Sequence, residues 1–600
     1  MHCGSNRRER GSLVTSKLFL VVGLFAAWLV SAAVRADEPA KLIAHWPLSA
    51  NARDVVGSAH GKPLNVKFGS GDAGSAKTGA FFNGRDSRIE VPDSKTLDVG
   101  TRDFSLAAWV RCEMPYQSVL GDLVSKFDPL ARRGINLHLS ASSPAYSASS
   151  DTRHVHFGID DAYLSDWEDH GRPWPSNSLV SNLVAFNGEL YCGIADADQP
   201  QDRAHVFRFA GGKKWVDCGR LGENPDHHSV MSMAVHDGKL YAGTGIWDWQ
   251  QAQGGVKNRP AAALTRVFVY EGGTRWRDLG QVGSGSRVLS LTTFKGSLYA
   301  GIDKVGKGHA YRYDAKSKKW IDCGSPDGRN LESFVAWGGT LFVATHGNVY
   351  AYENEQSWKR IASDPYDINQ IHCMQVFGGK LVIGTWPQGY VLRYAGGQNW
   401  DKMGRLGLPE GQPLINEIMD LTVYNGKLYT GIIPNAEVFR YETDGHWTQL
   451  GSLARRSDWD PNPKQVATWV RVTCVSAFQG RLFVGIGSCQ GRALDAPADP
   501  SLGRVKSMQA GQVVSHERDI GGAWTHVAAI RRGKNLELYI NGKLSSSSTL
   551  RAGAPFNLSN SMPLLIGNGV QNAFHGSMSD LKFYEGALDV NAVQTLARTK

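Results

Sequence analysis

The stretch LTVYNGKLYTGI at residues 421–432, followed by EVFRYETDGHW at 437–447, shows the unit from which most of this chain is built. Two runs of alternating apolar residues flank the Asn425-Gly426 dipeptide, a pattern typical of a tight β-hairpin. A third run, EVFRY, and a polar turn then lead to Trp447. The unit therefore predicts four short antiparallel strands.

The same unit recurs along the chain, for example as MAVHDGKLYAGT at 233–244 and VSAFQGRLFVGI at 475–486. The glycines of its first turn are Gly188, Gly238, Gly296, Gly339, Gly379, Gly426 and Gly480. Their spacing runs from 40 residues (339 to 379) to 58 residues (238 to 296). Four strands repeated at this period predict the blades of a β-propeller, because a lone blade cannot bury both of its faces.

A tryptophan marks the last strand of each unit. The residues are Trp167, Trp215, Trp276, Trp320, Trp358, Trp400 and Trp447. The first of them, in SDWEDHG at 165–171, precedes every hairpin, whereas the hairpin that begins near Cys474 has no tryptophan strand after it. We therefore expect 165–171 to complete that seventh blade, which closes the ring and removes its free sheet edges.

Two segments of the repeats, FGGKLVIGT at 377–385 and YRYDAKSKKW at 311–320, resemble those of kelch-type propellers. The resemblance covers roughly residues 165–520. It implies a fold and leaves the activity open, because propellers serve many functions.

The segments on either side of the repeats also alternate apolar and polar residues, which predicts strands. HWPL at 45–48, DFSLAAWV at 103–110, WTHVA at 524–528, LELYINGKL at 536–544 and GSMSDLKFY at 576–584 occur in one order. Together they resemble the laminin-G-like, concanavalin A-type jelly roll. We therefore predict an all-β protein, with the jelly roll split into 37–164 and 521–600 around a seven-bladed propeller at 165–520.

The N-terminus has the features of a secretory signal peptide. Arg7, Arg8 and Arg10 precede an apolar run from Leu18 to Val30, and small residues lead to Ala36. We expect cleavage after residue 36 and a secreted, periplasmic or cell-surface protein, with an uncleaved anchor as the alternative. No later segment is apolar enough to cross a bilayer.

The candidate site residues come from aligning the repeats on their turn glycines. Nine and seven residues before each glycine, the start of the innermost strand carries side chains that packing alone would not require. They are Arg287, Asn330, Glu332, His372, Glu417 and Arg471. Arginine suits capture of a carboxylate or sulfate, and Glu or His can transfer protons. Mutual ion pairing across the channel is the alternative.

The jelly roll shows no E-x-D-x-x-E strand of the kind used by retaining glucanases, so we expect this domain to be a binding or structural module. No cofactor is identified. By resemblance calcium could be held by Asp54 and Asp580, with turn capping or a solvated side chain as the alternative. The net charge of +9 is dispersed, so nucleic acid is not an expected partner.

We expect the jelly roll and propeller to recognise a glycan or other cell-surface material. One alternative is an enzyme, a lyase or hydrolase, that acts on acidic polysaccharide at the channel mouth. Another is a scaffold for other proteins. The cysteines have no metal or disulfide spacing, so mostly free, buried thiols are predicted, with Cys474–Cys489 the one pair to examine.

Overall fold

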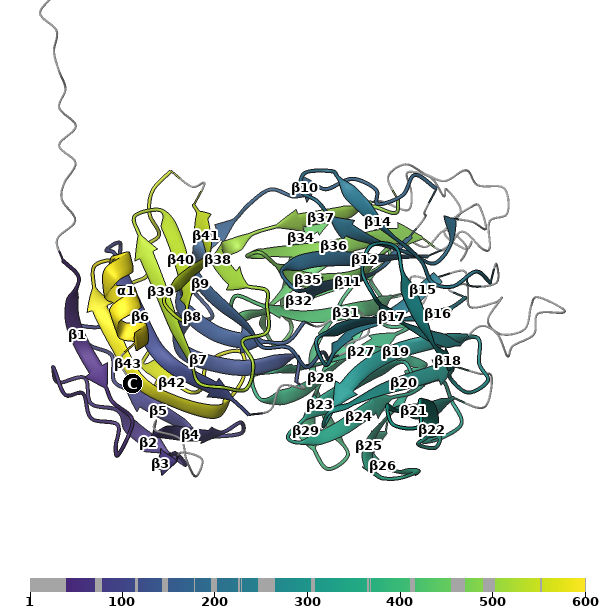
Figure 1. The fold of residues 1–600 in the computed structure, drawn as a ribbon, viewed down its shortest axis with the longest axis horizontal. Helices are drawn as coiled ribbons and strands as arrows, with labels where there is room; N and C mark the ends of the chain where they lie inside the picture. The colour runs from purple at the N-terminus through teal and green to yellow at the C-terminus, as the bar shows by residue number, and fades with distance from the viewer. Residues whose placement is uncertain are drawn as a thin grey trace, which may run out of the picture. The chain divides into compact units, whose positions relative to one another are not determined.

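β-Strands form nearly all of the regular structure in the computed structural model of this protein (Figure 1). The all-β prediction is confirmed. The structure describes residues 39–70, 78–113, 117–142, 149–176, 179–195, 202–224, 227, 229–246, 265–303, 308–363, 366, 368–410, 416–454, 470–488, 502–550 and 553–598. The predicted signal peptide at 1–36 lies outside these residues.

The two flanks of the repeats pair with each other in a β-sandwich. Its first sheet has the order β3-β4-β43-β6-β39-β40-β41, with β1 beside β43. The strands are β1 (Lys41–Trp46), β3 (Lys67–Ser70), β4 (Gly79–Asn83), β6 (Phe104–Cys112), β39 (Thr525–Arg532), β40 (Asn535–Ile540), β41 (Lys543–Thr549) and β43 (His575–Glu585). Because β6 from the N-terminal flank lies between β43 and β39 from the C-terminal flank, neither flank forms this sheet alone.

The second sheet of the sandwich has the order β2-β5-β42-β7-β8-β9-β38. The strands are β2 (Lys62–Leu64), β5 (Arg88–Val91), β7 (Val119–Asp128), β8 (Arg133–Ser140), β9 (His154–Leu164), β38 (Ala510–His516) and β42 (Leu564–Ile566). This sheet also mixes the two flanks.

Side chains along each strand of the sandwich point alternately into its core and away from it. On β6, Phe104 and Leu106 point into the core, where the Phe104 ring meets Phe157 of the facing sheet with centroids 6.0 Å apart. Ala107 points the other way and packs beneath helix α1 (Val590–Arg598). This nine-residue helix is far too short to cross a bilayer, and the described residues contain no membrane-spanning helix.

Between β9 and β38, the described strands form seven four-stranded antiparallel units, the blades of a propeller. Blades one to three are β11 (Leu179–Phe186), β12 (Glu189–Ala195), β13 (His205–Phe209), β14 (Trp215–Arg220); β15 (Ser229–His236), β16 (Lys239–Gly245), β17 (Arg266–Tyr270), β18 (Trp276–Gln281); and β19 (Arg287–Phe294), β20 (Ser297–Asp303), β21 (His309–Asp314), β22 (Lys319–Asp322). Blades four to six are β23 (Ser333–Trp337), β24 (Thr340–Ala344), β25 (Asn348–Asn354), β26 (Ser357–Ser363); β27 (Gln370–Phe377), β28 (Lys380–Trp386), β29 (Tyr390–Gly396), β30 (Asn399–Arg405); and β31 (Glu417–Tyr424), β32 (Lys427–Ile433), β33 (Glu437–Thr443), β34 (His446–Ser452).

The remaining blade joins the two ends of the repeat region. It contains β35 (Val470–Phe478), β36 (Arg481–Ser488), β37 (Val505–Met508) and β10 (Glu168–Asp169). β10 pairs antiparallel with β37, Glu168 opposite Ser507 (Figure 1). The predicted pairing of segment 165–171 with the sheet that begins near Cys474 is confirmed.

The tryptophans of the outer strands connect neighbouring blades. Trp276 Nε1 donates to the carbonyl oxygen of Cys218 at 2.8 Å, and Trp358 Nε1 donates to that of Cys323 at 2.8 Å. Trp215, Trp447 and Trp167 donate in the same way to His170, Met403 and Leu450. Each bond joins the outer strand of one blade to the outer edge of the preceding blade.

The chain leaves and re-enters the sandwich through one pair of strands. β38 pairs with β9, with Ala510 opposite Leu164, so the sandwich resumes at Ala510 and not at the predicted boundary of 521. The apolar residues of QVVSH explain the difference, because Val514 belongs to the sandwich core. Asn425 Nδ2 donates to the carbonyl oxygens of Ile159 (3.3 Å) and Ala510 (3.0 Å).

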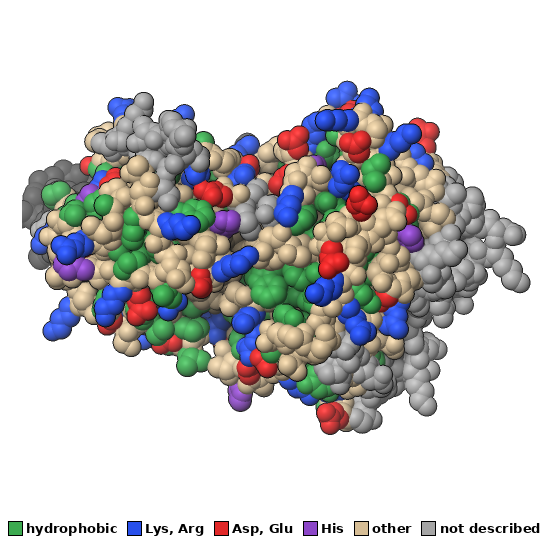
Figure 2. Space-filling model, turned by 90° about the horizontal axis from the view of Figure 1, so that it is seen from below, with side chains coloured by type: hydrophobic (Ala, Val, Ile, Leu, Met, Phe, Trp, Pro, Cys, Tyr) green, Lys and Arg blue, Asp and Glu red, His purple; other side chains and the backbone are tan. Residues whose placement is uncertain are grey.

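Basic and acidic side chains are interspersed on the face of the molecule shown in Figure 2. Lysine and arginine do not gather there into a continuous stripe. The thiols of Cys112, Cys192, Cys218, Cys323, Cys373 and Cys474 are free and buried, as predicted, and Cys489 lies outside the described residues.

Candidate functional site

The predicted channel residues lie at the beginning of the innermost strands of five consecutive blades. Arg287 and Glu417 are the first residues of β19 and β31, and His372 lies on β27. Glu332 directly precedes β23, and Arg471 is the second residue of β35. Arg287, Glu332, Glu417 and Arg471 are buried, with at most 9% of each residue exposed. His372 is partly buried, with 13% of its side chain exposed. The corresponding residues of the first two blades, such as Leu179 and Ser229, carry no charge.

Four of the charged residues of this channel cluster form ion pairs: Arg287, Glu332, His372 and Glu417. His372 Nε2 forms an ion pair with Glu417 and lies 3.0 Å from Gln370 Oε1. Glu332 Oε1 lies 2.8 Å from His346 Nε2. Arg287 forms an ion pair with Asp303.

Electrostatic coupling extends from pair to pair across the blades. Burial alone would raise the pKa of Glu332, but the hydrogen bond from His346 and the charges of His372 and Arg287 lower it to about 2. Burial opposes the charged form of His372, yet the carboxylates of Glu417 and Glu332 raise its pKa. The cluster therefore favours the protonated form of the imidazole of His372 and the ionised forms of Glu332 and Glu417.

Asp303 and His346 are members of this cluster that the repeat alignment does not include, because Asp303 ends the second strand of its blade and His346 follows the second strand of the next. Asp303 ends β20 directly opposite Arg287 in the hairpin register. Matching residues on the two strands outward from the turn at Gly296 places Asp303 opposite Arg287, so the sequence contained a signal for this pair. Asn330 is also buried, and its Nδ2 has no hydrogen-bond partner among the described residues.

A second feature, absent from the sequence predictions, is a groove of about 720 Å³ at one side of the sandwich. It lies between the edge strands β38 and β41. Its lining residues are Gly188, Gln479, Val513, Val514, Ser515, His516, Glu517, Arg518, Ile540, Lys543, Leu544, Ser545, Ser546, Ser547 and Ser548.

Hydroxyl groups and two basic side chains dominate this groove. Ser545 and Ser547 are exposed, as are Lys543 and Arg518. Ser545 Oγ lies 2.6 Å from His516 Nδ1. Leu544 is 55% exposed and adds an apolar surface. The groove can thus offer hydroxyl hydrogen bonds, positive charge and an apolar contact to one ligand.

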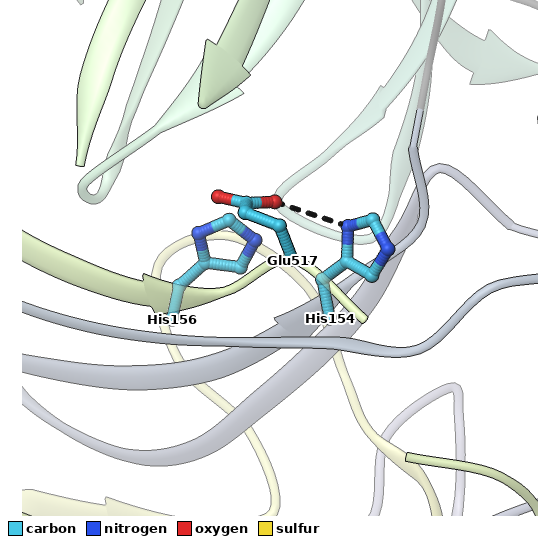
Figure 3. Close-up of side chains that lie close together, drawn as sticks. All are labelled: His154, His156 and Glu517. Atoms are coloured by element: carbon cyan, nitrogen blue, oxygen red, sulfur yellow. Dashed lines mark ion pairs between the residues drawn. The ribbon is translucent and has the colours of Figure 1, made fainter. Parts of the chain in front are cut away.

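A third feature is a buried cluster of His154, His156 and Glu517 (Figure 3). His154 Nδ1 lies 3.2 Å from Glu517 Oε2. Burial lowers the pKa of His156 to about 4, so that ring is neutral at neutral pH. Burial would raise the pKa of Glu517, but His154 and His156 lower it to about 2. The sequence contained part of this signal in the His-x-His of HVHFGIDD at 154–161.

The residues considered for calcium have other partners. Asp54 is buried and accepts backbone N–H bonds from His45 (2.9 Å), Val56 (3.0 Å) and Ala59 (3.1 Å). Asp580 lies 2.7 Å from both His45 Nε2 and Lys582 Nζ. These donors occupy the carboxylate oxygens that a calcium ion would need, which favours the turn-capping alternative for Asp54.

Known proteins resemble this chain in parts. Residues 451–594 match the family model described as the concanavalin A-like lectin/glucanases superfamily, which supports a domain of that kind. No curated protein sequence matches the chain.

Three solved structures are similar to parts of this chain. Virginiamycin B lyase from Staphylococcus aureus is 8% identical with a TM-score of 0.39, covering 57% of this chain and 99% of that one. YCF48 from Cyanidioschyzon merolae is 9% identical with a TM-score of 0.39, covering 57% and 99%. The extracellular domain of BT4673 from B. thetaiotaomicron is 13% identical with a TM-score of 0.40, covering 65% of this chain and 48% of that one.

Proposed function

We propose that this protein is an exported binding protein that recognises an acidic glycan in the groove between β38 and β41. The observation that carries the proposal is the composition of that groove, in which the run Ser545–Ser548 lines the same surface as the exposed side chains of Arg518 and Lys543. The concanavalin A-like match at 451–594 includes both edge strands.

The groove fits a saccharide in size and chemistry. Its volume of about 720 Å³ falls in the range of small-ligand sites, roughly 300–1,000 Å³. Serine hydroxyls both donate and accept, as sugar hydroxyls do, and Leu544 offers a surface for the C–H groups of a sugar ring. Arg518 and Lys543 would pair with a carboxylate or sulfate of the glycan.

The proposal also includes export of the protein and the insertion of the propeller into the sandwich. A leader at 1–36 would direct the chain to the periplasm, the cell surface or the medium. The pairing of β9 with β38 supports a sandwich interrupted by the propeller. The face shown in Figure 2 carries mixed charge and no basic stripe of the kind that duplex nucleic acid requires.

The test is a glycan array probed with the mature chain, followed by calorimetry with each bound glycan. Binding to acidic glycans should weaken with added salt and fall about tenfold or more in the double variant R518A/K543A. The variant K359A/R360A removes an exposed basic pair on β26 and should bind normally. An array without bound glycans, or equal affinities for the two double variants, would disprove the proposal.

A second candidate function is an enzyme on acidic polysaccharide, and the His372–Glu417 pair favours it. An imidazole that is ion-paired to a carboxylate and has a raised pKa is suited to proton transfer. Incubation with acidic polysaccharides should then release oligosaccharides, and E417Q should abolish the release. Intact polysaccharides after incubation with the wild-type chain would count against this function.

A further inference from the structure

The cluster of His154, His156 and Glu517 comes from two neighbouring strands of the sandwich. His154 and His156 are two residues apart on β9, so both side chains lie on one face of the sheet. On β38, Ser515 pairs with His156 and His516 pairs with Val155, which places Glu517 next to His154 at the end of the ladder. Figure 3 shows the Glu517 carboxylate beside the His156 ring, with one oxygen directed towards His154.

The potential ligand atoms are close together and shielded from solvent. One nitrogen of each histidine and one oxygen of Glu517 all lie within 4.8 Å of one another. The exposed fractions are 2% for His154 and 5% each for His156 and Glu517. A metal ion bound by all three at about 2.0–2.2 Å requires only small side-chain movements from these positions.

Neighbouring groups hold these side chains in place. Glu517 Oε1 accepts hydrogen bonds from the Gln479 N–H (3.0 Å) and the Ser515 hydroxyl (2.5 Å). Glu517 Oε2 therefore remains on the side of the histidines. His156 Nε2 lies 2.8 Å from Ser140 Oγ. Such outer contacts orient metal ligands in proteins.

A small polar cavity adjoins the cluster. Its volume is about 30 Å³, which is enough for one water molecule. Its lining includes both histidines and the side chains of Ser118, Ser140, Ser142, Gln375, Thr422 and Ser476. A metal site with three protein ligands needs such a space for a water molecule in the fourth position.

We propose that His154, His156 and Glu517 bind a zinc ion, with a water molecule from the adjoining cavity as fourth ligand. Two imidazoles and one carboxylate form a donor set that zinc favours and that calcium and magnesium, which prefer all-oxygen sites, do not. An internal His154–Glu517 ion pair would explain two of the residues. His156, which contacts Ser140 and stacks on His138 with ring centroids 5.0 Å apart, and the cavity beside it are not part of that pair.

The position of Glu517 gives this site a structural role. The carbonyl oxygen of Glu517 accepts a bond from the Gly188 N–H of the first blade at 2.8 Å, and its side chain is bonded by Gln479 of the seventh. A zinc ion at this point would therefore fix the sandwich to the two blades that close the propeller ring.

The test is metal binding by the full chain after treatment with a chelator. Zinc titration followed by calorimetry should give one ion per chain. Cobalt(II) should give the visible absorption of a four-coordinate site. E517Q and H156A should each weaken zinc binding by more than the roughly 10–100-fold typical of outer contacts. H309A, which removes an imidazole from the His309–Asp322 pair on the propeller, should bind zinc as the wild type does.

Thermal unfolding distinguishes loss of the site from loss of the fold. Zinc should raise the Tm of the wild type and H309A, and should leave the Tm of E517Q unchanged. Because glutamine still accepts the Gln479 N–H, E517Q should remain folded without zinc. Binding of calcium in preference to zinc, binding weaker than about 100 µM, or equal zinc binding by H156A and H309A would overturn the proposal.

Discussion

Trp167 donates its indole N–H to the carbonyl oxygen of Leu450 at 3.0 Å, although 283 residues separate the two in the chain. This bond joins the segment that enters the propeller to the sixth blade. Together with the pairing of Glu168 and Ser507, it shows that the first residues of the repeat region lie beside the last ones.

Replacement of Trp167 by phenylalanine should destabilise the propeller by about 1 kcal/mol, because the Leu450 carbonyl loses its indole donor. The free energy of unfolding in urea measures the effect. W320F is the matched control, since the buried Trp320 Nε1 has no hydrogen-bond partner among the described residues. Equal losses in the two variants would contradict a specific role for the Trp167 bond.

Asn425 should stabilise the junction of sandwich and propeller. Its side-chain amide donates to Ile159 and Ala510, so N425A leaves two carbonyls without that donor and should cost about 1–3 kcal/mol. N187A replaces the residue at the equivalent turn of the first blade, which is exposed and has a similar positive φ. Subtracting the change in unfolding free energy caused by N187A from that caused by N425A corrects for the backbone strain at the turn. If the two variants unfold alike, Asn425 does not secure the junction.

The channel cluster should make stability depend on pH in both directions. The pKa of Glu332 in the folded protein is about 2, below its ordinary value of 4.5. Ionised Glu332 therefore adds to the free energy of unfolding above pH 4.5, and this stabilisation is lost as the pH falls towards 2. The pKa of His372 in the folded protein is raised above the ordinary value of 6.5. Protonated His372 therefore adds to the free energy of unfolding below pH 6.5, and this stabilisation is lost as the pH rises through the folded pKa.

Denaturation of E332Q across pH 2–5 tests the acid limb. The unfolding free energy of the variant should fall less steeply with acid than that of the wild type. E353Q alters an exposed glutamate on β25 and should keep the wild-type slope. Parallel slopes for wild type and E332Q would show that Glu332 is not held ionised in the fold.

Buried thiols should resist alkylation in the native protein. Burial raises the pKa of Cys192 and Cys373 well above the usual value for a thiol, which keeps them protonated and unreactive. Mass spectrometry should find both unmodified after native treatment with iodoacetamide and modified after denaturation. Rapid native labelling would contradict the buried arrangement.

Much of the fold could be predicted from local patterns. The Asn-Gly and Gly-Gly hairpins and the recurring tryptophans define four-stranded units, and the unpaired SDWEDHG strand indicates how the ring closes. The alignment on turn glycines also placed Arg287, Glu332 and His372 in equivalent positions. Those positions are near one another because every innermost strand begins at the same end of a propeller.

The tertiary structure was needed to identify the partners of those residues. It was also needed to identify the groove and the His154, His156 and Glu517 cluster. Asp303 ends a second strand and His346 follows one, so a comparison of first strands alone does not include them. Glu517 lies 361 residues after His156 in the chain, within a segment that the sequence assigned to the propeller.

The sequence by itself determined the all-β class, the repeating blades and the order of strands, because alternation and turn residues act over a few positions. Only the tertiary structure decided that β38 returns to β9 and so brings Glu517 to His154 and His156. It also decided that β38 lies beside β41 to form the groove. Pairing between distant edge strands depends on the register and packing of the whole sandwich, which no short stretch of sequence specifies.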